Sequence, residues 1–255
     1  MKIHHFRNAT FIIEVADKFI LVDPMIGPVG TMPTFTFFRF KAKKNPIVPL
    51  PENCKPLLEK VTHCIITHQH PDHIDQEGER FLSERQIPVY CSIKDEAAFR
   101  KKGFNIVQTI DYLKRIPAFG GQIEGIPARH GYGFIAKPMG NVMGFYLELP
   151  DAPSIYISSD TIYTDAVENV LLNYRPDISI VAAGTAQLDI FQPLLMRMED
   201  ILKFVRQAPG KVIANHLEAV NHCPTTRTGL RAELIRHKLS ERVFIPEDGT
   251  SVHFD

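Results

Sequence analysis

The stretch Val61–His73, VTHCIITHQHPDH, decides how this sequence is interpreted. Its short apolar run ends in three histidines and an aspartate, which predicts a buried strand that presents polar side chains at its end. His68 and His70 are two residues apart, so both point to the same side of an extended backbone. The following proline ends the strand and lets Asp72 and His73 fold back beside them. Imidazole and carboxylate groups at this density predict a site for a divalent metal such as zinc.

The composition excludes several classes of protein. Hydrophobic residues make up 44% and charged residues 23% of the 255 residues, as in ordinary globular proteins. Lys plus Arg equals Asp plus Glu at 29 each, so no overall charge favours nucleic acid, and we expect a small-molecule substrate instead. The first residues do not resemble a signal peptide, and no apolar run is long enough for a membrane span. The cysteines have no paired C-x-x-C spacing, which suits a reducing compartment, and we expect a cytoplasmic protein.

Strand and helix patterns alternate along the chain without a composition break, which predicts a single domain over residues 1–255 of the α/β (α+β) class. The expected strands are 2–6, 10–15, 19–22, 89–91, 106–110, 122–126, 142–149, 154–158, 178–182, 211–214 and 242–245. The expected helices are 76–85, 94–102, 164–174, 198–207 and 226–239.

A long Pro- and Phe-rich insertion at about residues 27–58 interrupts this order and includes the run TFTFFRFK at 34–41. So many phenylalanines need burial against something, which argues against disorder. Three interpretations stay open: a lid over the site, a surface for a second subunit in a homo-oligomer, or a loop packed on its own domain. Aromatic residues beside basic ones could also stack on bases, but a single such run in a neutral chain is weak evidence.

Three further strand ends carry a residue that can bind a metal. His130, Asp160 and His216 each come directly after an apolar run, as His68 does. In layered α/β proteins, sites gather where strands end and loops begin. Taken singly, each residue has a simpler explanation, as a loop histidine, a helix cap or a core histidine. Together with the first motif they make seven ligands, the number that two adjacent metal ions need.

The stretch Thr67–His73, followed by His130, Asp160 and His216, resembles the metallo-β-lactamase-fold hydrolase superfamily over the whole chain. The resemblance implies a four-layer αββα sandwich with the site at one edge of two facing sheets. It also implies that His68, His70 and His130 hold one metal, that Asp72, His73 and His216 hold the other, and that Asp160 bridges them. Asp23 and Thr67 would support the ligands from behind, although Asp23 by itself could equally be a strand-end cap.

Within the superfamily, the layout and Ser159-Asp160-Thr161 are most similar to the L-ascorbate-6-phosphate lactonase-like group. That implies a metal-dependent hydrolase that uses a metal-activated hydroxide on a small ester, lactone or phosphorylated substrate, with Asp72 as the catalytic carboxylate. We expect two divalent ions, zinc first, although manganese and iron(II) also suit such ligands. The alternatives are a phosphodiesterase for a nucleotide or phospholipid-like substrate and a non-catalytic, metal-stabilised binding or assembly protein.

The segment Asn215–Cys223 contains further polar residues whose roles the sequence leaves open. His222 could contact substrate, replace His216 as a ligand, or cap the helix that follows. We expect His216 to be the ligand, because it directly ends a strand. Glu218 and His222 are the candidates for the substrate side, and Cys223 is a weaker ligand candidate.

Overall fold

Two seven-stranded sheets face each other in the computed structural model, which describes residues 1–254. Residue 255, the last of the predicted domain, lies outside the described residues. The first sheet has the order β14-β1-β2-β3-β4-β5-β6, with β1 Lys2–Arg7, β2 Thr10–Val15, β3 Lys18–Val22, β4 His63–Ile66, β5 Pro88–Ser92, β6 Asn105–Ile110 and β14 Ser251–His253. The second has the order β13-β12-β11-β10-β9-β8-β7, with β7 Arg115–Ala118, β8 Gly121–Pro127, β9 Met143–Glu148, β10 Ile155–Ile157, β11 Ile178–Ala182, β12 Lys211–Asn215 and β13 Val243–Phe244.

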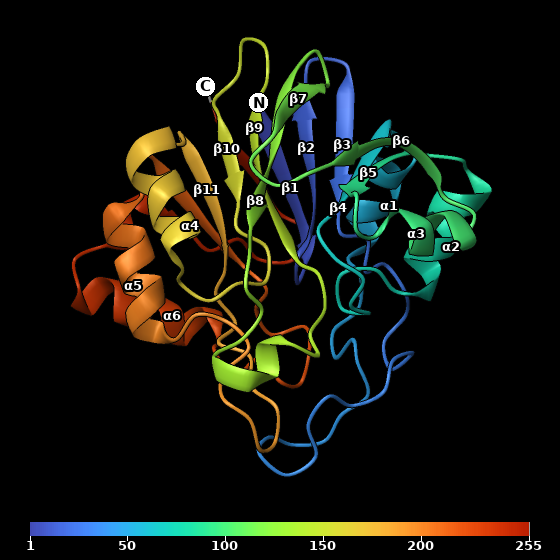
Figure 1. The fold of residues 1–255 in the computed structure, drawn as a ribbon. Helices are drawn as coiled ribbons and strands as arrows, with labels where there is room; N and C mark the ends of the chain where they lie inside the picture. The colour runs from blue at the N-terminus through green and yellow to red at the C-terminus, as the bar shows by residue number, and fades with distance from the viewer. Residues whose placement is uncertain (255) are drawn as a thin grey trace.

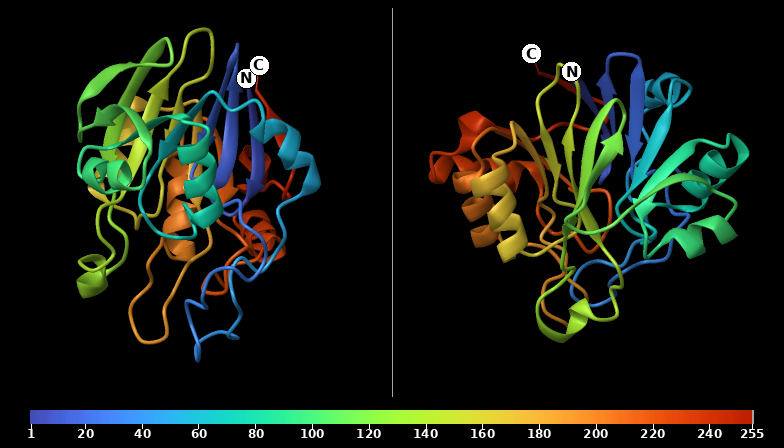
Figure 2. Two further views of the ribbon diagram at one scale, coloured as in Figure 1. Left: turned by 90° about the vertical axis from the view of Figure 1, so that its right-hand side faces the viewer. Right: turned by 45° about the horizontal axis from the view of Figure 1, so that its top comes forward.

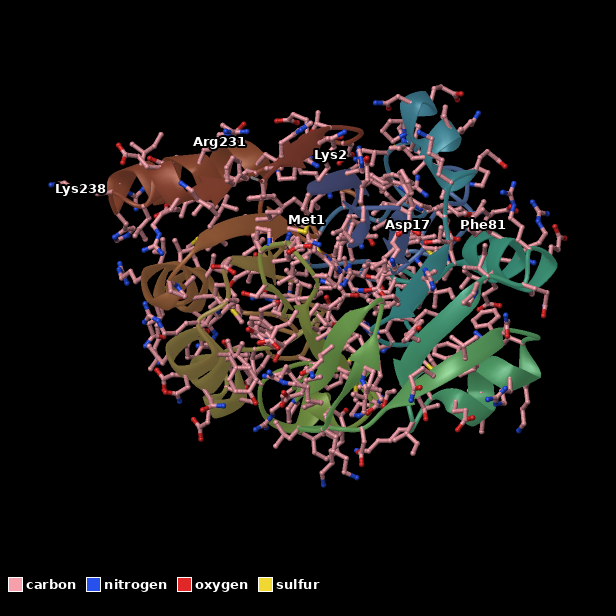
Figure 3. The ribbon with its side chains drawn as sticks, turned by 90° about the horizontal axis from the view of Figure 1, so that it is seen from above. Met1, Lys2, Asp17, Phe81, Arg231 and Lys238 are labelled. Atoms are coloured by element: carbon pink, nitrogen blue, oxygen red, sulfur yellow. The ribbon has the colours of Figure 1, made fainter. Side chains whose placement is uncertain are left out.

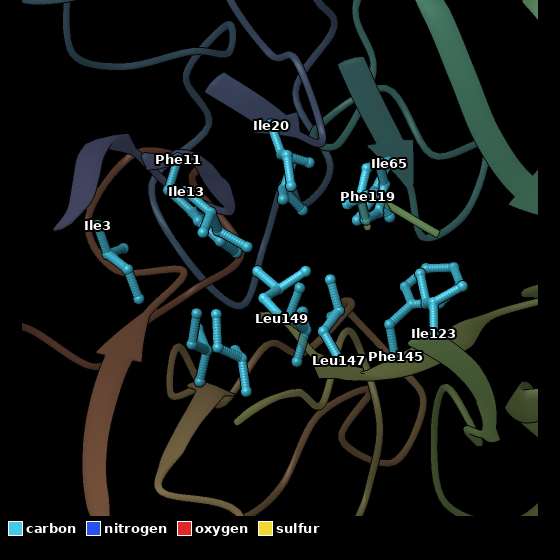
Figure 4. Packing of buried hydrophobic residues seen from close by; sticks show 14 of the residues in the cluster. Ile3, Phe11, Ile13, Ile20, Ile65, Phe119, Ile123, Phe145, Leu147 and Leu149 are labelled. Atoms are coloured by element: carbon cyan, nitrogen blue, oxygen red, sulfur yellow. The ribbon is translucent and has the colours of Figure 1, made fainter. Parts of the chain in front are cut away.

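The main hydrophobic core lies between the two sheets (Figure 4). Ile13, Ile20 and Ile65 from the first sheet pack against Phe145 and Leu147 from the second. The central strands β10 and β11 are buried along their whole length, which explains why their sequences are continuously apolar rather than alternating.

Helices cover the outer face of each sheet. α1 Lys55–Leu58, α2 Gln76–Glu84 and α3 Glu96–Lys101 lie beside the first sheet, and α4 Asp165–Asn169, α5 Met198–Gln207 and α6 Arg227–Arg236 beside the second (Figure 1). Viewed from above, α6 with Arg231 and α2 with Phe81 lie on opposite sides of the strands (Figure 3). The four-layer αββα arrangement predicted from the sequence is confirmed. Within residues 1–254, none of the helices has the length and apolar character needed to cross a membrane.

The structure corrects several predicted elements. Three elements were not predicted: strands β7 and β14 and the short helix α1. All three are too short to show a periodic pattern, and β7 also contains Pro117, which is unusual within a strand. The predicted helix 164–174 is α4 followed by a π-helical turn at Val170–Tyr174. The insertion at 27–58 ends in the 3₁₀ turn Glu52–Cys54 and α1, so only its first part lacks regular structure.

Three loops gather at the end of the molecule opposite the two chain termini (Figures 1 and 2). We call residues 28–48, 131–141 and 185–196 the roof loops. The amide of Tyr132 donates to the carbonyl oxygen of Pro193, which joins two of these loops, and the amide of Gln187 donates to the carbonyl oxygen of His222. The ligand-bearing strand ends open toward the same region.

Candidate metal centre

The seven side chains predicted as metal ligands converge where four strands end. Their positions are His68, His70, Asp72 and His73 after β4, His130 after β8, Asp160 after β10 and His216 after β12. Pro71 begins a turn in which the amide of His73 donates to the carbonyl oxygen of His70, at 2.9 Å. The turn brings Asp72 and His73 back toward the end of β4, as the proline predicted.

The potential ligand atoms form two groups. In one, atoms of His68, His70 and His130 lie within 4.8 Å of one another, and the same limit holds for Asp72, His73, Asp160 and His216 in the other. Asp160 lies between the groups: its Oδ1 is 3.1 Å from Nε2 of His73, and its Oδ2 is 3.5 Å from Nε2 of His130. This is the position of a carboxylate that can bridge two cations.

Four of the histidines have their Nδ1 atoms engaged on the side away from the centre. The pairs are His68 with Thr67 Oγ1 at 2.9 Å, His73 with Asp23 Oδ2 at 2.8 Å, His130 with the Leu194 carbonyl at 3.0 Å and His216 with Cys223 Sγ at 3.4 Å. Partners of this kind fix the ring orientation and leave Nε2 free to bind a metal. The rings therefore present their Nε2 atoms to the interior of the cluster.

The arrangement of these atoms fits divalent cations. Nε2 of His68 is buried and has no hydrogen-bond partner, and the Nε2 atoms of His73 and His216 lie 3.2 Å apart. Buried nitrogen atoms that lack a partner cost free energy unless another group satisfies them. Three imidazoles in one group, and two imidazoles with two carboxylates in the other, are donor sets that borderline-soft divalent metals accept.

The second group contains ionised carboxylates that are paired with imidazoles. Burial alone raises the pKa of Asp160, but the imidazoles of His216 and His73 outweigh it and hold that pKa well below its usual range. For His73 the effects are reversed: burial lowers the pKa of the imidazole, but the carboxylates of Asp160 and Asp23 raise it to about 10. The carboxylates Asp72 and Asp160 are therefore ionised and keep His73 and His216 protonated, and a divalent ion that binds here would replace those protons.

Asp23 and Thr67 support the ligands from behind. The backbone amide of Thr67 donates to Asp23 Oδ1 at 2.8 Å, and its hydroxyl donates to Oδ2 at 2.7 Å, the oxygen that also contacts His73. The backbone φ angle is positive, between 47° and 60°, at three residues that come just after strands: Asp23, Ser159 and His216. Non-glycine residues rarely adopt this left-handed conformation, and it is concentrated where function constrains the backbone.

A cavity of about 190 Å³ lies over the cluster. His70, Asp72 and His130 line the side nearest the cluster, so three predicted ligands face both the metal positions and the cavity. The roof loops supply four apolar lining residues: Phe35, Met139, Leu188 and Leu194. The other two lining residues are Pro71 and His222, and His222 is the polar one. No lysine or arginine lines it within the described part of the chain.

The two predicted substrate-side residues are placed differently. His222 lines the cavity, its Nδ1 is buried without a partner, and burial lowers its pKa to about 4. The helix cap is Thr226, whose hydroxyl accepts from the Gly229 amide, so His222 does not have that role. Glu218 is bonded to Arg227 through both the backbone amide and the guanidinium, away from the cavity lining.

Sequence reasoning missed the residues that hold the roof loops. The side chain of Asn221 accepts from the Phe35 amide and donates to Thr34 Oγ1 and to the Thr36 carbonyl. Asp189 accepts from the backbone amides of Phe37, Phe38 and Arg39. Asp189 lies in no motif, Asn221 was not distinguished within the segment Asn215–Cys223, and the partners are about 150 to 187 residues away. Among the cavity-lining residues, Phe35 could have been suspected from the aromatic run at 34–41. Nothing in the sequence indicated that Met139, Leu188 and Leu194 would line the cavity.

The profile of a family described as the beta-lactamase superfamily domain matches residues 18–216. The UPF0173 protein YddR of Bacillus subtilis is 31% identical over the whole of both chains. A UPF0173 metal-dependent hydrolase of Xanthobacter autotrophicus is 26% identical, with 72% of each chain covered.

Two solved structures are similar over nearly the full length. An isothiocyanate hydrolase from Delia radicum gut bacteria has a TM-score of 0.89 and 28% identity, covering 100% of this chain and 99% of the other. A possible metal-dependent hydrolase from Veillonella parvula has a TM-score of 0.90 and 28% identity, covering 99% and 98%.

Proposed function

Because the chain belongs to the beta-lactamase superfamily domain family and to the UPF0173 metal-dependent hydrolases, we propose a substrate class for it. The proposed substrate is a small, uncharged electrophile with an apolar substituent. The observation that carries the proposal is the cavity over the ligand cluster. Its walls are apolar, and no cationic side chain lines it within residues 1–254.

The size of the cavity limits the substrate. An apolar cavity of about 150 Å³ holds benzene in another protein, so a volume of about 190 Å³ suits a ring or short alkyl chain attached to a reactive group. Proteins commonly recognise phosphate with arginine, lysine or a helix N-terminus. The lack of a cation in the lining favours an uncharged ester, lactone or related compound over the phosphorylated substrates that the sequence also allowed.

Two similarities suggest which reactive groups to test. One solved relative is an isothiocyanate hydrolase, and an isothiocyanate joins an electrophilic carbon to one organic substituent. The resemblance to the L-ascorbate-6-phosphate lactonase-like group adds lactones. We therefore place isothiocyanates first, and simple esters and lactones second.

We propose that His68, His70 and His130 hold one divalent ion, that Asp72, His73 and His216 hold a second, and that Asp160 bridges them. Zinc is the first metal to test because the donor set is rich in imidazole. When bound, such ions lower the pKa of a water and stabilise negative charge that develops on the substrate.

The protein's own residues have separate roles in this proposal. Asp72 borders both the ligand cluster and the cavity, where its carboxylate can orient the attacking water and accept its proton. His222 is neutral near pH 7, because burial lowers its pKa to about 4, so one ring nitrogen can donate a hydrogen bond to the substrate. Phe35, Met139, Leu188 and Leu194 exclude water and hold the apolar substituent.

A substrate panel tests the function. Metal-replete protein is assayed with phenethyl isothiocyanate, p-nitrophenyl butyrate and γ-nonalactone, and with p-nitrophenyl phosphate and bis(p-nitrophenyl) phosphate as charged counterparts. We expect kcat/KM to be at least about 100-fold higher for an uncharged substrate, a difference of roughly 3 kcal/mol in transition-state binding. A higher kcat/KM for either phosphate compound would overturn the proposal. Elemental analysis of protein purified without added metal identifies the ions.

A further inference from the structure

The most exposed apolar side chains of residues 1–254 lie on the loops that line the cavity. Among residues 1–254, the three large hydrophobic side chains with the highest exposure are Phe38 at 90%, Ile190 at 80% and Phe134 at 75%. Each lies on a different roof loop, and each roof loop also contributes a wall of the cavity. Phe37 and Phe191 are exposed beside them. We call Phe37, Phe38, Phe134, Ile190 and Phe191 the apolar rim.

Hydrogen bonds hold two of the rim segments in place. Asp189 accepts the amides of Phe37, Phe38 and Arg39 and also bonds the Thr36 hydroxyl. The guanidinium of Arg39 donates back to the carbonyl oxygen of Leu188 at 2.8 Å and to Gln187 Oε1 at 2.9 Å. Loops 28–48 and 185–196 are therefore clasped together, and the clasp leaves Phe37 and Phe38 facing solvent. The backbone of Phe37 and Phe38 is therefore fixed by hydrogen bonds while their rings stay exposed.

Positive charge accompanies the rim. Residues 28–48 contain Arg39, Lys41, Lys43 and Lys44 without an acidic residue, residues 131–141 contain only Lys137 and residues 185–196 only Asp189. Five positive charges and one negative charge give the roof loops a net charge of +4, whereas the whole chain has 29 of each sign and is neutral. Within the described residues, Lys41, Lys43 and Lys44 are exposed and form no salt bridge.

We propose that the roof loops form a membrane-docking surface, in which the apolar rim inserts at the interface of an anionic lipid bilayer while the surrounding lysines contact its headgroups. Apolar side chains that enter the headgroup–acyl boundary, together with basic residues that attract anionic lipid, are the two components of peripheral membrane binding. Both occur here on the same three loops.

A second copy of this chain fits the rim less well. In a twofold interface the same patch meets itself, so a surface with a net charge of +4 would face another of the same charge. Like charges brought together in this way oppose association. An anionic surface is complementary to the same positive charge.

Docking would place the cavity toward the bilayer, because the loops that carry the rim also form the cavity walls. A small molecule with an apolar substituent partitions into lipid, so a docked protein would meet such a substrate at higher local concentration. Only this consequence rests on the proposed function; the docking itself does not.

Sedimentation with vesicles tests the proposal. The full chain is mixed with vesicles of phosphatidylcholine alone or with about 30 mol% phosphatidylglycerol, at about 50 mM and about 300 mM salt. We expect binding to the anionic vesicles that weakens with salt. Phe38→Ser combined with Ile190→Ser, and separately Lys43→Glu combined with Lys44→Glu, should each reduce the partition coefficient at least about tenfold.

The matched control combines Leu113→Ser with Ile235→Ser, since these side chains are 60% and 64% exposed but lie outside the roof loops. The control should bind vesicles like the wild type, and hydrolysis of a water-soluble substrate without vesicles should be the same in all variants. No binding to anionic vesicles at low salt, or equal loss in the control, would overturn the proposal. A wild-type dimer that Phe38→Ser converts to a monomer, without vesicle binding, would instead identify the rim as a subunit interface.

Discussion

The ligand cluster and the roof loops lie side by side, yet they are held in place by different means. Each predicted ligand lies within seven residues of the end of a strand, and nearby buried groups such as Asp23 and Thr67 orient several of the imidazole rings. The roof loops have little regular structure, and single side chains such as Asn221 and Asp189 hold them through backbone amides and carbonyls.

This difference separates the chemistry from the choice of substrate. Groups on rigid elements keep the geometry that metal binding requires. Loops tolerate sequence change without loss of the scaffold, and binding specificity is often located on them. We therefore expect changes in the ligand cluster to remove activity altogether, and changes in the cavity walls that the roof loops supply to alter which substrates are accepted while metal content stays constant.

The largest effect is expected for His70→Ala. Loss of one imidazole from the group His68, His70 and His130 should lower bound metal and reduce kcat/KM at least about 1000-fold. Elemental analysis and steady-state kinetics measure the two effects, and circular dichroism should show an unchanged fold. Gln69→Ala is the control, because that side chain donates to Asp95 and not to the cluster. Full metal content in His70→Ala would contradict the assignment of this residue.

A smaller effect is expected for Asp23→Asn, which keeps the size of the side chain but removes its charge. Asp23 accepts from Thr67 and orients His73, so the change should weaken metal affinity or activity about 10- to 100-fold. Metal titration by calorimetry and kcat/KM measure these quantities. Wild-type affinity together with wild-type activity would show that Asp23 is only a strand-end cap.

Asn221→Ala should affect the roof loops alone. The change leaves the Phe35 amide without its partner and removes the bond from Asn221 to the Thr36 carbonyl, so protease cleavage within 34–44 should become faster and kcat/KM should fall about tenfold. Metal content should match the wild type. Asn173→Ala, at an exposed position on the surface, is the control. Loss of metal in Asn221→Ala would show that the two regions are not independent.

The smallest effect is expected for Phe35→Ala. Removing this wall of the cavity should lower the preference for an aralkyl over a methyl substituent by about three- to tenfold, with little change for the smallest substrate. The ratio of kcat/KM values for phenethyl and methyl isothiocyanate, or for the corresponding esters, measures it. Phe37→Ala is the control, because that ring is on the same loop but faces solvent. An equal shift in both variants would place the selectivity elsewhere.

Much of the fold could be predicted because its signals are local. The strands β2, β3 and β11 and the helix α5 follow from patterns within ten residues, and their predicted bounds agree with the structure to within one residue. β7 and β14 were missed because a strand of three or four residues has too short a pattern, and its existence depends on pairing with β8 or β1.

The candidate site divides in the same way. His68, His70, Asp72 and His73 form a recognisable motif within six residues, and the later ligands follow apolar strands. Glu218 and His222 look equivalent in the sequence, and only the turn after His216 separates them. It directs Glu218 to Arg227 and His222 into the cavity.

The sequence by itself determined most of the strands and helices and the set of residues able to bind metal, because strand ends and short motifs are encoded by neighbours in the chain. Only the tertiary structure decided the shape and polarity of the cavity. Phe35, Met139 and Leu188 become neighbours when loops far apart in sequence dock on one another, and contacts such as that between Phe35 and Asn221 span 186 residues. The docking depends on hydrogen bonds and packing that no local pattern records.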